Sequence, residues 1–333
     1  MSSGPALAVT PAVGMVIIGR NEGERLRRCL ESCRAVDSRR VYVDSGSTDD
    51  SVQLALDSGA RVVRLDMTRP FTAARARNAG LDELRRECPD VTMVQFIDGD
   101  CELMPQWLSA AAEYLDQHPD IAAVAGRLCE RFPDKSVFNR MCDIEWNTAV
   151  GEARSFGGIV FIRVDAFLGA GGFREDLIAG EEPELCVRLC ARGARLWRLD
   201  RDMAWHDANI LHLSQWWRRT VRSGHAFAEG ASLHGRPPER HFAAETRRAL
   251  LWGAVLPSII LVAACVAPGA LLLFLVYPLQ WLRVGLSLAR RDSPIPWTYG
   301  GFLLLGRFPE ALGAIKFYLG RLFNRRSALI EYK

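Results

Sequence analysis

Short apolar runs alternate with longer amphipathic segments over the first 130 residues of the chain. The apolar runs are rich in β-branched residues, which is typical of buried strands, and the segments between them have the periodicity of helices with one apolar face. This pattern predicts strands at 14–18, 41–43, 61–65, 91–97 and 121–126, and helices at 24–35, 51–58 and 105–117. The segment 69–80 is expected to lead into a further helix that runs through Glu87. Strands that alternate with helices of this length predict an α/β fold with a mainly parallel sheet and flanking helices.

The pattern weakens between Phe132 and Val150 and then resumes. Gly157 and Gly158 form a turn before a predicted strand at 159–162. A helix is expected within 177–192, because Pro183 suits a first helical turn and acidic residues around it suit the positive end of the helix dipole. A short strand is predicted at 196–199.

Polar residues follow three of the predicted strands directly. Asn21 comes after the first strand, Asp44 after the second, and Asp98-Gly99-Asp100 after the strand that ends at Ile97. Taken alone, the last of these fits an ordinary Asp-Gly turn. Ligands of parallel sheets bind outside the carboxyl ends of the strands, where the three clusters would converge. We therefore expect a site there, with carboxylates that hold a divalent cation and leave positions open for phosphate oxygens.

Charge and cysteine content narrow the class of protein. The net charge of +3 is too small to suggest nucleic-acid binding. The nine cysteines show neither a paired framework nor zinc-finger spacing, which favours free thiols in a reducing cytosol. Residues 1–13 lack the basic and apolar regions of a secretory signal, and we expect them to form an N-terminal tail.

A nearly uncharged apolar stretch at 249–280 is longer than the roughly 20 residues that a membrane span needs. It fits one kinked span, a helical hairpin that turns near residues 267–269, or a buried helix pair in a soluble domain. The hairpin, extended to 289, leaves basic pairs at both ends on one side, as the positive-inside rule prefers. Residues 299–324 carry charges among apolar positions and are expected to form an amphipathic helix at the membrane interface.

The motifs together support a family resemblance. Five segments carry it, in this order: Val16–Glu22 (VIIGRNE), Val43–Asp49 (VDSGSTD), Ala76–Gly80 (ARNAG), Phe96–Asp100 (FIDGD), and Gly180–Leu185 (GEEPEL) with Arg188 after it. In these segments the chain resembles the family-2 glycosyltransferases, which have the GT-A fold and transfer a sugar from a nucleotide-diphospho-sugar with inversion. The resemblance covers about residues 14–225. It implies a catalytic domain at 14–230, with a donor-binding half (14–130) and an acceptor half (131–230), followed by a membrane-associated helical region at 231–333.

The resemblance also implies roles for single residues. Asp100 matches the metal ligand of the family, and His206 lies where many relatives place a histidine near the metal, so Mn²⁺ or Mg²⁺ is expected as cofactor. Glu181-Glu182 stands where the family usually has Glu-Asp, and the second acid of that pair is the general base. The longer side chain leaves Glu181, Glu182 and Glu184 as alternatives, with Glu182 favoured. Donor-binding positions are Arg20, Asn21, Glu22, Asp44, Arg77, Asn78, Asp98, Arg219 and Arg222.

We expect a membrane-associated inverting glycosyltransferase whose catalytic domain faces the cytoplasm at the inner membrane. Its expected partners are the nucleotide-sugar, a glycan or lipid-linked acceptor of the kind used in exopolysaccharide or surface-glycan assembly, and membrane lipid, but not nucleic acid. A sugar-nucleotide nucleotidyltransferase is one alternative, although Gly19–Gly23 lacks the lysine of a phosphate loop. An inactive nucleotide-sugar-binding scaffold is another, although Asp98, Asp100 and Glu182 are all present.

Overall fold

The computed structural model describes residues 13–324 of the chain, which form two compact units. The sheet unit contains the described residues up to Leu177 together with Glu181–Asn209, and the helical unit contains Ile178–Gly180 and the described residues from Ile210 onward. Apart from Val13, the predicted N-terminal tail lies outside the described residues. The division into functional domains at residue 230 stays a prediction; residue 230 itself lies within one long helix of the helical unit.

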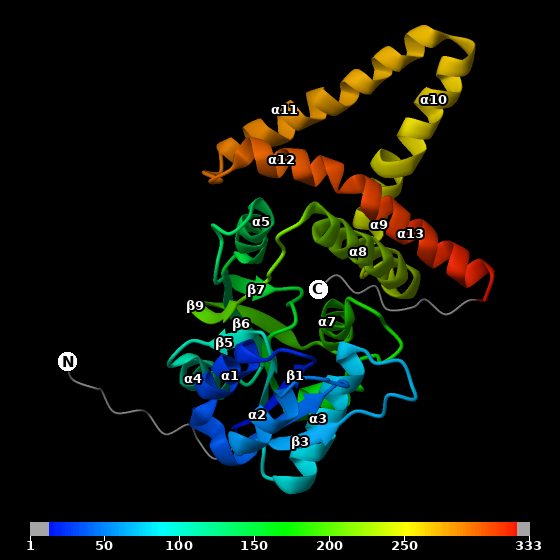
Figure 1. The fold of residues 1–333 in the computed structure, drawn as a ribbon. Coiled ribbons are helices and arrows are strands. Elements are labelled where there is room, and N and C mark those ends of the chain that lie inside the picture. Colours follow the sequence, from blue (N-terminus) through cyan, green and yellow to red (C-terminus); the bar gives the residue numbers. More distant parts are fainter. Residues whose placement is uncertain (1–12, 325–333) are drawn as a thin grey trace. The chain divides into compact units, whose positions relative to one another are not determined.

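A single mixed sheet of nine strands forms the centre of the sheet unit (Figure 1). Its strands run in the order β3-β2-β1-β4-β8-β6-β9-β5, and β7 pairs with β9. The first four strands in this order are parallel to one another, as the alternating pattern predicted. The strands are β1 (Val13–Gly19), β2 (Arg40–Asp44), β3 (Arg61–Arg64), β4 (Met93–Asp98), β5 (Cys101–Leu103), β6 (Ile121–Glu130), β7 (Gly151–Ala153), β8 (Val160–Arg163) and β9 (Arg195–His206).

Helices flank this sheet and cover its apolar side chains. They are α1 (Glu24–Ser32), the 3₁₀ segment η1 (Arg34–Arg39), α2 (Ser51–Asp57), α3 (Ala73–Glu87), α4 (Trp107–Gln117), α5 (Val137–Trp146), α6 (Val164–Gly169) and α7 (Glu181–Ala191). Helix α3 comes very close to the sheet at Gly80, where an added Cβ would lie 2.3 Å from Val16 Cγ1 and 2.9 Å from Val43 Cγ2. Only glycine fits this contact. The close contact fixes the position of α3, and with it the position of the preceding helical turn, relative to the strand ends.

The second half of the sheet differs from the sequence prediction. Strand β8 runs antiparallel to both β4 and β6, and β9 runs antiparallel to β5. Strand β9 is 12 residues long, whereas only 196–199 were predicted. Charged residues at 200–202 interrupt the apolar run, yet the strand continues because its backbone pairs with β5 and β6. The short strands β5 and β7 have three residues each, too few for a periodic signal.

The helical unit consists of α8 (Leu213–His234), α9 (Ala243–Leu250), η2 (Leu251–Val255), α10 (Leu256–Val266), η3 (Pro268–Leu275), α11 (Val276–Ala289), α12 (Pro296–Leu305) and α13 (Arg307–Leu322). Helix α13 packs along α8 through small residues. The predicted single helix at 299–324 is two helices, because Pro309 has no N–H to donate to the carbonyl of Leu305 and the helix breaks one turn earlier.

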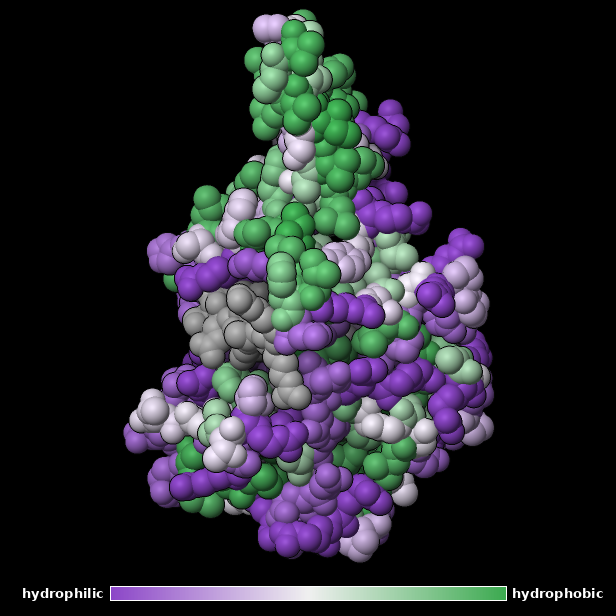
Figure 2. Space-filling model, turned by 90° about the vertical axis from the view of Figure 1, so that its right-hand side faces the viewer, coloured by the Kyte–Doolittle hydropathy of each residue, from purple (hydrophilic) through white to green (hydrophobic). Residues whose placement is uncertain are grey.

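The apolar stretch forms two helical segments joined by a turn at Ala267, as in the hairpin alternative. The segments Ala243–Val266 and Pro268–Ala289 have 24 and 22 residues, and each is long and apolar enough to cross a membrane. Only 11% and 6% of their most apolar windows are buried, unlike the core helices of soluble domains. Hydrophobic side chains cover the hairpin along most of the face shown in Figure 2.

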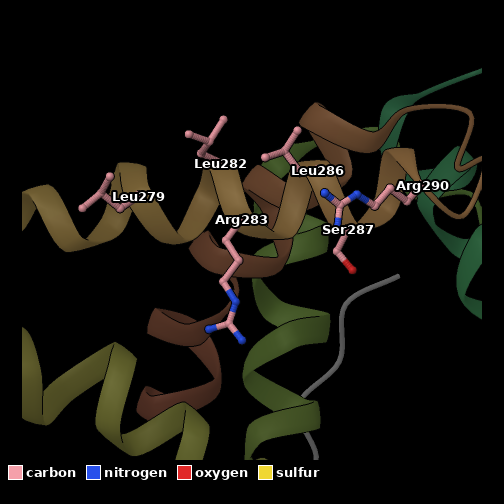
Figure 3. Close-up of a pocket in the computed structure, with 6 residues that line it drawn as sticks. All are labelled: Leu279, Leu282, Arg283, Leu286, Ser287 and Arg290. Atoms are coloured by element: carbon pink, nitrogen blue, oxygen red, sulfur yellow. The ribbon is translucent and has the colours of Figure 1, made fainter.

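Helix α11 has two distinct stripes near its C-terminal end. Figure 3 shows Leu282 and Leu286 on one side of the helix, while Arg283 and Ser287 point away from them. Together they line an open pocket on the helix surface, formed by Leu279, Leu282, Arg283, Leu286, Ser287 and Arg290.

Candidate functional site

The strand ends that were expected to converge do lie side by side. In the parallel ladder Gly19 of β1 is opposite Asp44 of β2, and Ile18 is opposite Asp98 of β4. Asn21 joins the loops after β1 and β2, since its Oδ1 accepts a hydrogen bond of 2.7 Å from the Thr48 backbone N–H. Asn21 has a φ of 55°, a left-handed conformation that asparagine tolerates better than most residues.

Asp44 is a buried turn residue at this edge. Its Oδ2 accepts hydrogen bonds from the backbone N–H groups of Gly46 and Ser47, at 3.1 and 3.0 Å. Its Oδ1 accepts a longer bond of 3.4 Å from the hydroxyl of Tyr42. Burial and the nearby Asp44 carboxylate raise the pKa of Tyr42 above its ordinary value. Asp44 therefore stabilises the turn that follows β2. Its contact with a nucleotide stays a prediction.

Arg20 and Glu22 lie in the loop that follows β1. Arg20 is exposed, and its guanidinium stands 5.0 Å from the ring centroid of Phe71. Glu22 forms an ion pair of 2.7 Å with Arg25 at the start of α1. Both side chains border the carboxyl edge of the sheet, so a ligand at this edge can reach Arg20. Their predicted roles in donor binding are not tested by these contacts.

Asn78 fixes a neighbouring loop. Its amide nitrogen donates to the carbonyl of Phe173 at 2.8 Å, and its Oδ1 accepts from the Phe173 N–H at 3.0 Å. Arg188 holds the same loop by donating to the carbonyl of Gly172 at 2.7 Å, and it pairs with the buried Glu184 at 2.6 Å. Glu184 thus serves as the partner of Arg188, and its role as an alternative base stays a prediction.

Arg77 lies at the centre of a buried ion network that the sequence did not reveal. Its Nη1 donates to Glu181 at 2.9 Å and to Glu182 at 2.7 Å, and its Nη2 donates to Asp98 at 2.8 Å. The Arg77 side chain is 2% exposed. Burial alone would lower the pKa of Arg77, but Asp98, Glu182 and Glu181 outweigh it and raise that pKa. A phosphate contact by Arg77, as predicted from the sequence, stays a prediction, because its described partners are carboxylates of the protein.

Glu182 has the properties expected of a general base. Burial, and then the adjacent Glu181, raise the pKa of Glu182 to about 7, although the Arg77 cation opposes this rise. Its side chain is 13% exposed, compared with 6% for Glu181, so Glu182 is the more accessible of the two. Gly158 allows the backbone to approach: a Cβ there would lie 3.1 Å from Glu182 Oε1 and 2.9 Å from Arg77 Nη2.

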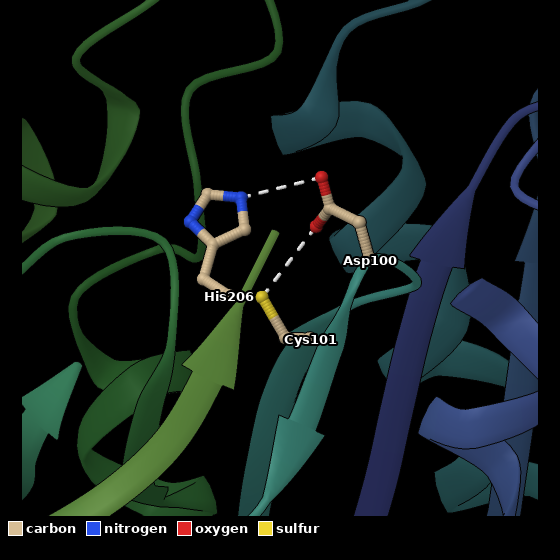
Figure 4. Close-up of side chains that lie close together, drawn as sticks. All are labelled: Asp100, Cys101 and His206. Atoms are coloured by element: carbon tan, nitrogen blue, oxygen red, sulfur yellow. Dashed lines mark hydrogen bonds and ion pairs between the residues drawn. The ribbon is translucent and has the colours of Figure 1, made fainter. Parts of the chain in front are cut away.

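A second cluster gathers three possible metal ligands around Asp100 (Figure 4). His206 Nε2 lies 3.2 Å from Asp100 Oδ2, and Cys101 Sγ lies 3.5 Å from Asp100 Oδ1. Cys101 had no sequence signal, because its place opposite His206 in the β5–β9 ladder appears only in the structure.

The His206 ring is held in place by its neighbours. It stacks on Trp146 of α5, with ring centroids 4.7 Å apart. Glu130, opposite His206 in the β6–β9 ladder, accepts from the backbone N–H groups of Phe132 and Ala208, both at 3.0 Å, and from the Asn139 amide at 2.9 Å. Burial raises the pKa of Glu130. Glu130 and Trp146 are supporting residues that sequence reasoning missed; only the Ser136 cap of α5 hints at this helix.

The side chains of the Asp100 cluster fit a divalent metal ion. A carboxylate and an imidazole are both ligands that Mn²⁺ accepts, and the candidate ligand atoms of Asp100, Cys101 and His206 all lie within 4.8 Å of one another. The Nδ1 atom of His206 is buried and finds no hydrogen-bond partner among residues 13–324.

Arg219 and Arg222, also predicted to contact the donor, lie on α8 and belong to the helical unit.

Comparison with known proteins agrees with this geometry. Residues 15–161, which run from within β1 to the start of β8 and include the Asp98-Gly99-Asp100 turn, match the family described as Glycosyl transferase family 2. The match is limited to this segment, which corresponds to a glycosyl transferase family 2 domain. Sequence relatives include proteins named as glycosyltransferases. The chain is 28% identical over 239 residues to the pre-mycofactocin glycosyltransferase of Mycobacterium tuberculosis, an alignment that covers 67% of this chain and 48% of the relative. The chain thus spans about half the length of that relative.

Solved structures show that the family 2 domain has the GT-A fold. A mannosyltransferase from Pyrobaculum calidifontis, PcManGT, solved in complex with GDP-Man and Mn²⁺, aligns with a TM-score of 0.60 and 20% identity, over 95% of this chain and 91% of that one. TarS of S. aureus (residues 1–349) aligns with a TM-score of 0.50 and 16% identity, over 88% and 91% of the two chains. At these identities the likeness concerns the fold.

Proposed function

We propose that this protein is an inverting glycosyltransferase that uses Glu182 to activate an acceptor hydroxyl. The observation that supports this most is the raised pKa of Glu182, about 7, at the carboxyl edge of a GT-A sheet. A base works best when its pKa lies near the working pH, because it is then partly ionised and still accepts a proton readily. The neighbouring Glu181 has less access, and Glu184 is paired with Arg188.

In the proposed reaction the acceptor oxygen attacks the anomeric carbon of a nucleotide-diphospho-sugar. Glu182 takes the hydroxyl proton while the bond from the anomeric carbon to the diphosphate oxygen breaks, and the single displacement inverts the anomeric centre. Arg77 orients the Glu182 carboxylate through the 2.7 Å hydrogen bond. Asp98, whose side chain is 34% exposed, remains within reach of the donor at the same edge.

Asp100 and His206 would hold the divalent ion, for which Mn²⁺ is the candidate favoured by the carboxylate–imidazole pair. When bound, such an ion would neutralise the negative charge of the diphosphate leaving group. GDP-mannose and UDP-N-acetylglucosamine, named with structural neighbours, are reasonable first donors to test.

The acceptor is proposed to be a lipid-linked glycan at the cytoplasmic face of the inner membrane. Support comes from the hairpin, whose two apolar segments have few buried residues. On α11 the leucine stripe can enter the lipid while Arg283 and Arg290, which have no partner among the described side chains, can meet anionic headgroups. Together these features suit a protein that acts on a substrate anchored in the membrane.

The test of the base uses the full chain in membranes or mild detergent. A panel of nucleotide-sugars is supplied with membrane-extracted lipid acceptors and Mn²⁺, and nucleoside diphosphate release and product linkage are measured. Glu182→Gln should lower turnover by about 10²- to 10⁴-fold, the usual contribution of a general base. Glu152→Gln, which changes an exposed carboxylate on β7, serves as the matched control and should keep its rate. Full turnover by Glu182→Gln would exclude the proposed mechanism.

A separate test addresses the membrane. The full chain is mixed with vesicles of neutral lipid or of neutral lipid with phosphatidylglycerol, and flotation is measured. The double variant Arg283→Gln and Arg290→Gln should float less with anionic vesicles and unchanged with neutral ones. The control double variant Arg39→Gln and Arg61→Gln, in the sheet unit, should float like the wild type with both kinds of vesicle. Complete release of the wild-type chain from cell membranes by alkaline carbonate would contradict a spanning hairpin.

A further inference from the structure

Cys101 occupies a position that the expected Asp–His metal site does not require. It is the first residue of β5, and the antiparallel ladder places it directly opposite His206 of β9. Side chains of directly opposed residues point to the same face of a sheet. The Cys101 thiol therefore enters the site beside the imidazole, and Asp100 lies between the two with one oxygen toward each (Figure 4).

Burial makes this thiol a defined part of the site. Cys101 is 1% exposed and Asp100 is 7% exposed. The sulfur, a carboxylate oxygen and an imidazole nitrogen lie within 4.8 Å of one another, which is the spacing that one ion can bridge with little movement. Three ligand atoms of three different chemical types thus lie close together.

We propose that Cys101 is a third metal ligand and that this site binds the thiophilic cations Zn²⁺ and Cd²⁺ in competition with Mn²⁺. Thiolate is a soft ligand that selects Zn²⁺ and similar ions, whereas carboxylate and water ligands suit Mg²⁺ and Mn²⁺. Zn²⁺ also generally binds sites of nitrogen, oxygen and sulfur ligands more tightly than Mn²⁺ does. The inference rests on the proposed metal site around Asp100, and it adds the Cys101 thiolate to that site as a soft ligand.

The functional consequence is selective inhibition. Mn²⁺ held by Asp100 and His206 leaves positions open for phosphate oxygens. A Zn²⁺ or Cd²⁺ ion drawn toward the Cys101 sulfur would occupy the same ligands and displace Mn²⁺. Low concentrations of thiophilic cations should therefore block the site even with Mn²⁺ in excess.

The experiment measures metal binding without a sugar donor. The purified full chain in mild detergent, stripped of metal, is titrated with Cd²⁺, and thiolate-to-cadmium charge transfer is followed in the ultraviolet. Mn²⁺ binding is measured separately by electron paramagnetic resonance, and its release by added Cd²⁺ is recorded. Cys101→Ser should lose the absorption band and weaken Cd²⁺ binding by at least about tenfold, since even outer-shell changes cost metal sites that much. Its Mn²⁺ binding should change far less, because Asp100 and His206 remain.

Two control variants separate the possible outcomes. Cys142→Ser replaces another buried cysteine, which lies on α5 outside the cluster, and should keep the full band. Asp100→Asn should weaken both Mn²⁺ and Cd²⁺; if it weakens neither, the metal site of the proposed function is wrong. If Asp100→Asn behaves as expected while Cys101→Ser retains the band and the Cd²⁺ affinity, only the thiol inference is overturned. Absence of Cd²⁺ binding by the wild-type chain also overturns it.

Discussion

Removing the charge of Arg77 should destabilise the sheet unit strongly and in a pH-dependent way. Arg77→Met keeps much of the side-chain length but leaves Glu181, Glu182 and Asp98 without their shared cation. Each charge-assisted hydrogen bond contributes roughly 1.5–3 kcal/mol. The bond to Asp98 is discounted because that carboxylate is one-third exposed and screened by water.

The bonds of Arg77 to the two buried glutamates, Glu181 and Glu182, then decide how much unfolding free energy the variant loses. Their bonds together give roughly 3–6 kcal/mol, and removal of one partner from a buried ion pair costs roughly 3–5 kcal/mol by direct comparison. We therefore expect a loss of about 3–5 kcal/mol near pH 8. This is a large part of the ordinary stability of a domain, which is roughly 5–15 kcal/mol.

The pH dependence follows from the sign of the pKa shift. The pKa of Glu182 is already raised to about 7 in the folded wild type, and it rises further when the Arg77 cation is gone. The folded variant then binds more protons than its unfolded chain as the pH falls below this raised value, so folding is increasingly favoured. The destabilisation by Arg77→Met should thus be smaller at pH 5 than at pH 8.

Urea unfolding of the full chain in mild detergent, followed by tryptophan fluorescence, provides the measurement. Trp107 is buried in the same unit and reports its unfolding. Arg86→Met changes an arginine on the same helix whose side chain is 64% exposed, and it should leave the midpoint almost unchanged. The account of the network fails if Arg77→Met unfolds at the same urea concentration as Arg86→Met, or if its loss is equal at pH 5 and pH 8.

Three further predictions concern the site. The value of kcat/KM should rise as the pH increases through about 7, because Glu182 must lose its proton to act as a base, and the residual activity of Glu182→Gln should lack this rise. Gly158→Ala should lower kcat with little change in the unfolding midpoint, since its Cβ would press on flexible ends of Arg77 and Glu182. Glu130→Gln should cost about 1–3 kcal/mol in urea unfolding, because an amide N–H would face backbone donors. It should also weaken Mn²⁺ binding measured by paramagnetic resonance, because Glu130 supports the strand end of His206.

The parallel half of the sheet, β1 to β4, could be predicted from the sequence because its signals are local. Each parallel strand is a short apolar run that ends in a polar turn, and the ladder then places Asp44 and Asp98 beside the end of β1. The remaining half of the sheet, β5 to β9, could not be predicted to the same degree. Strand β9 continues through charged residues because β5 and β6 pair with it, and pairing between distant segments leaves no periodic trace in the sequence.

The same limit applies to individual site residues. The position of Asp100 follows from its motif, but the approach of His206 and Cys101 depends on the register of β5 against β9. Arg77 shows the limit most clearly. Its place in a motif indicated a ligand contact, whereas its partners are separated from it by 21, 104 and 105 positions along the chain. Such distances are closed only by the packing of α3 and α7 around the strand ends.

The network around Arg77 explains how one edge of the sheet can keep two kinds of chemistry apart. In the proposed mechanism Glu182 must accept a proton, while Asp100 must hold a cation. A divalent ion bound to Glu182 would suppress its basicity, so the proposed mechanism requires that the ion bind elsewhere. Arg77 supplies a fixed positive charge to Asp98, Glu181 and Glu182, and its planar fork can satisfy several carboxylates at once. In the proposed mechanism, Asp100 and its neighbours on β5 and β9 are thereby left to bind the metal.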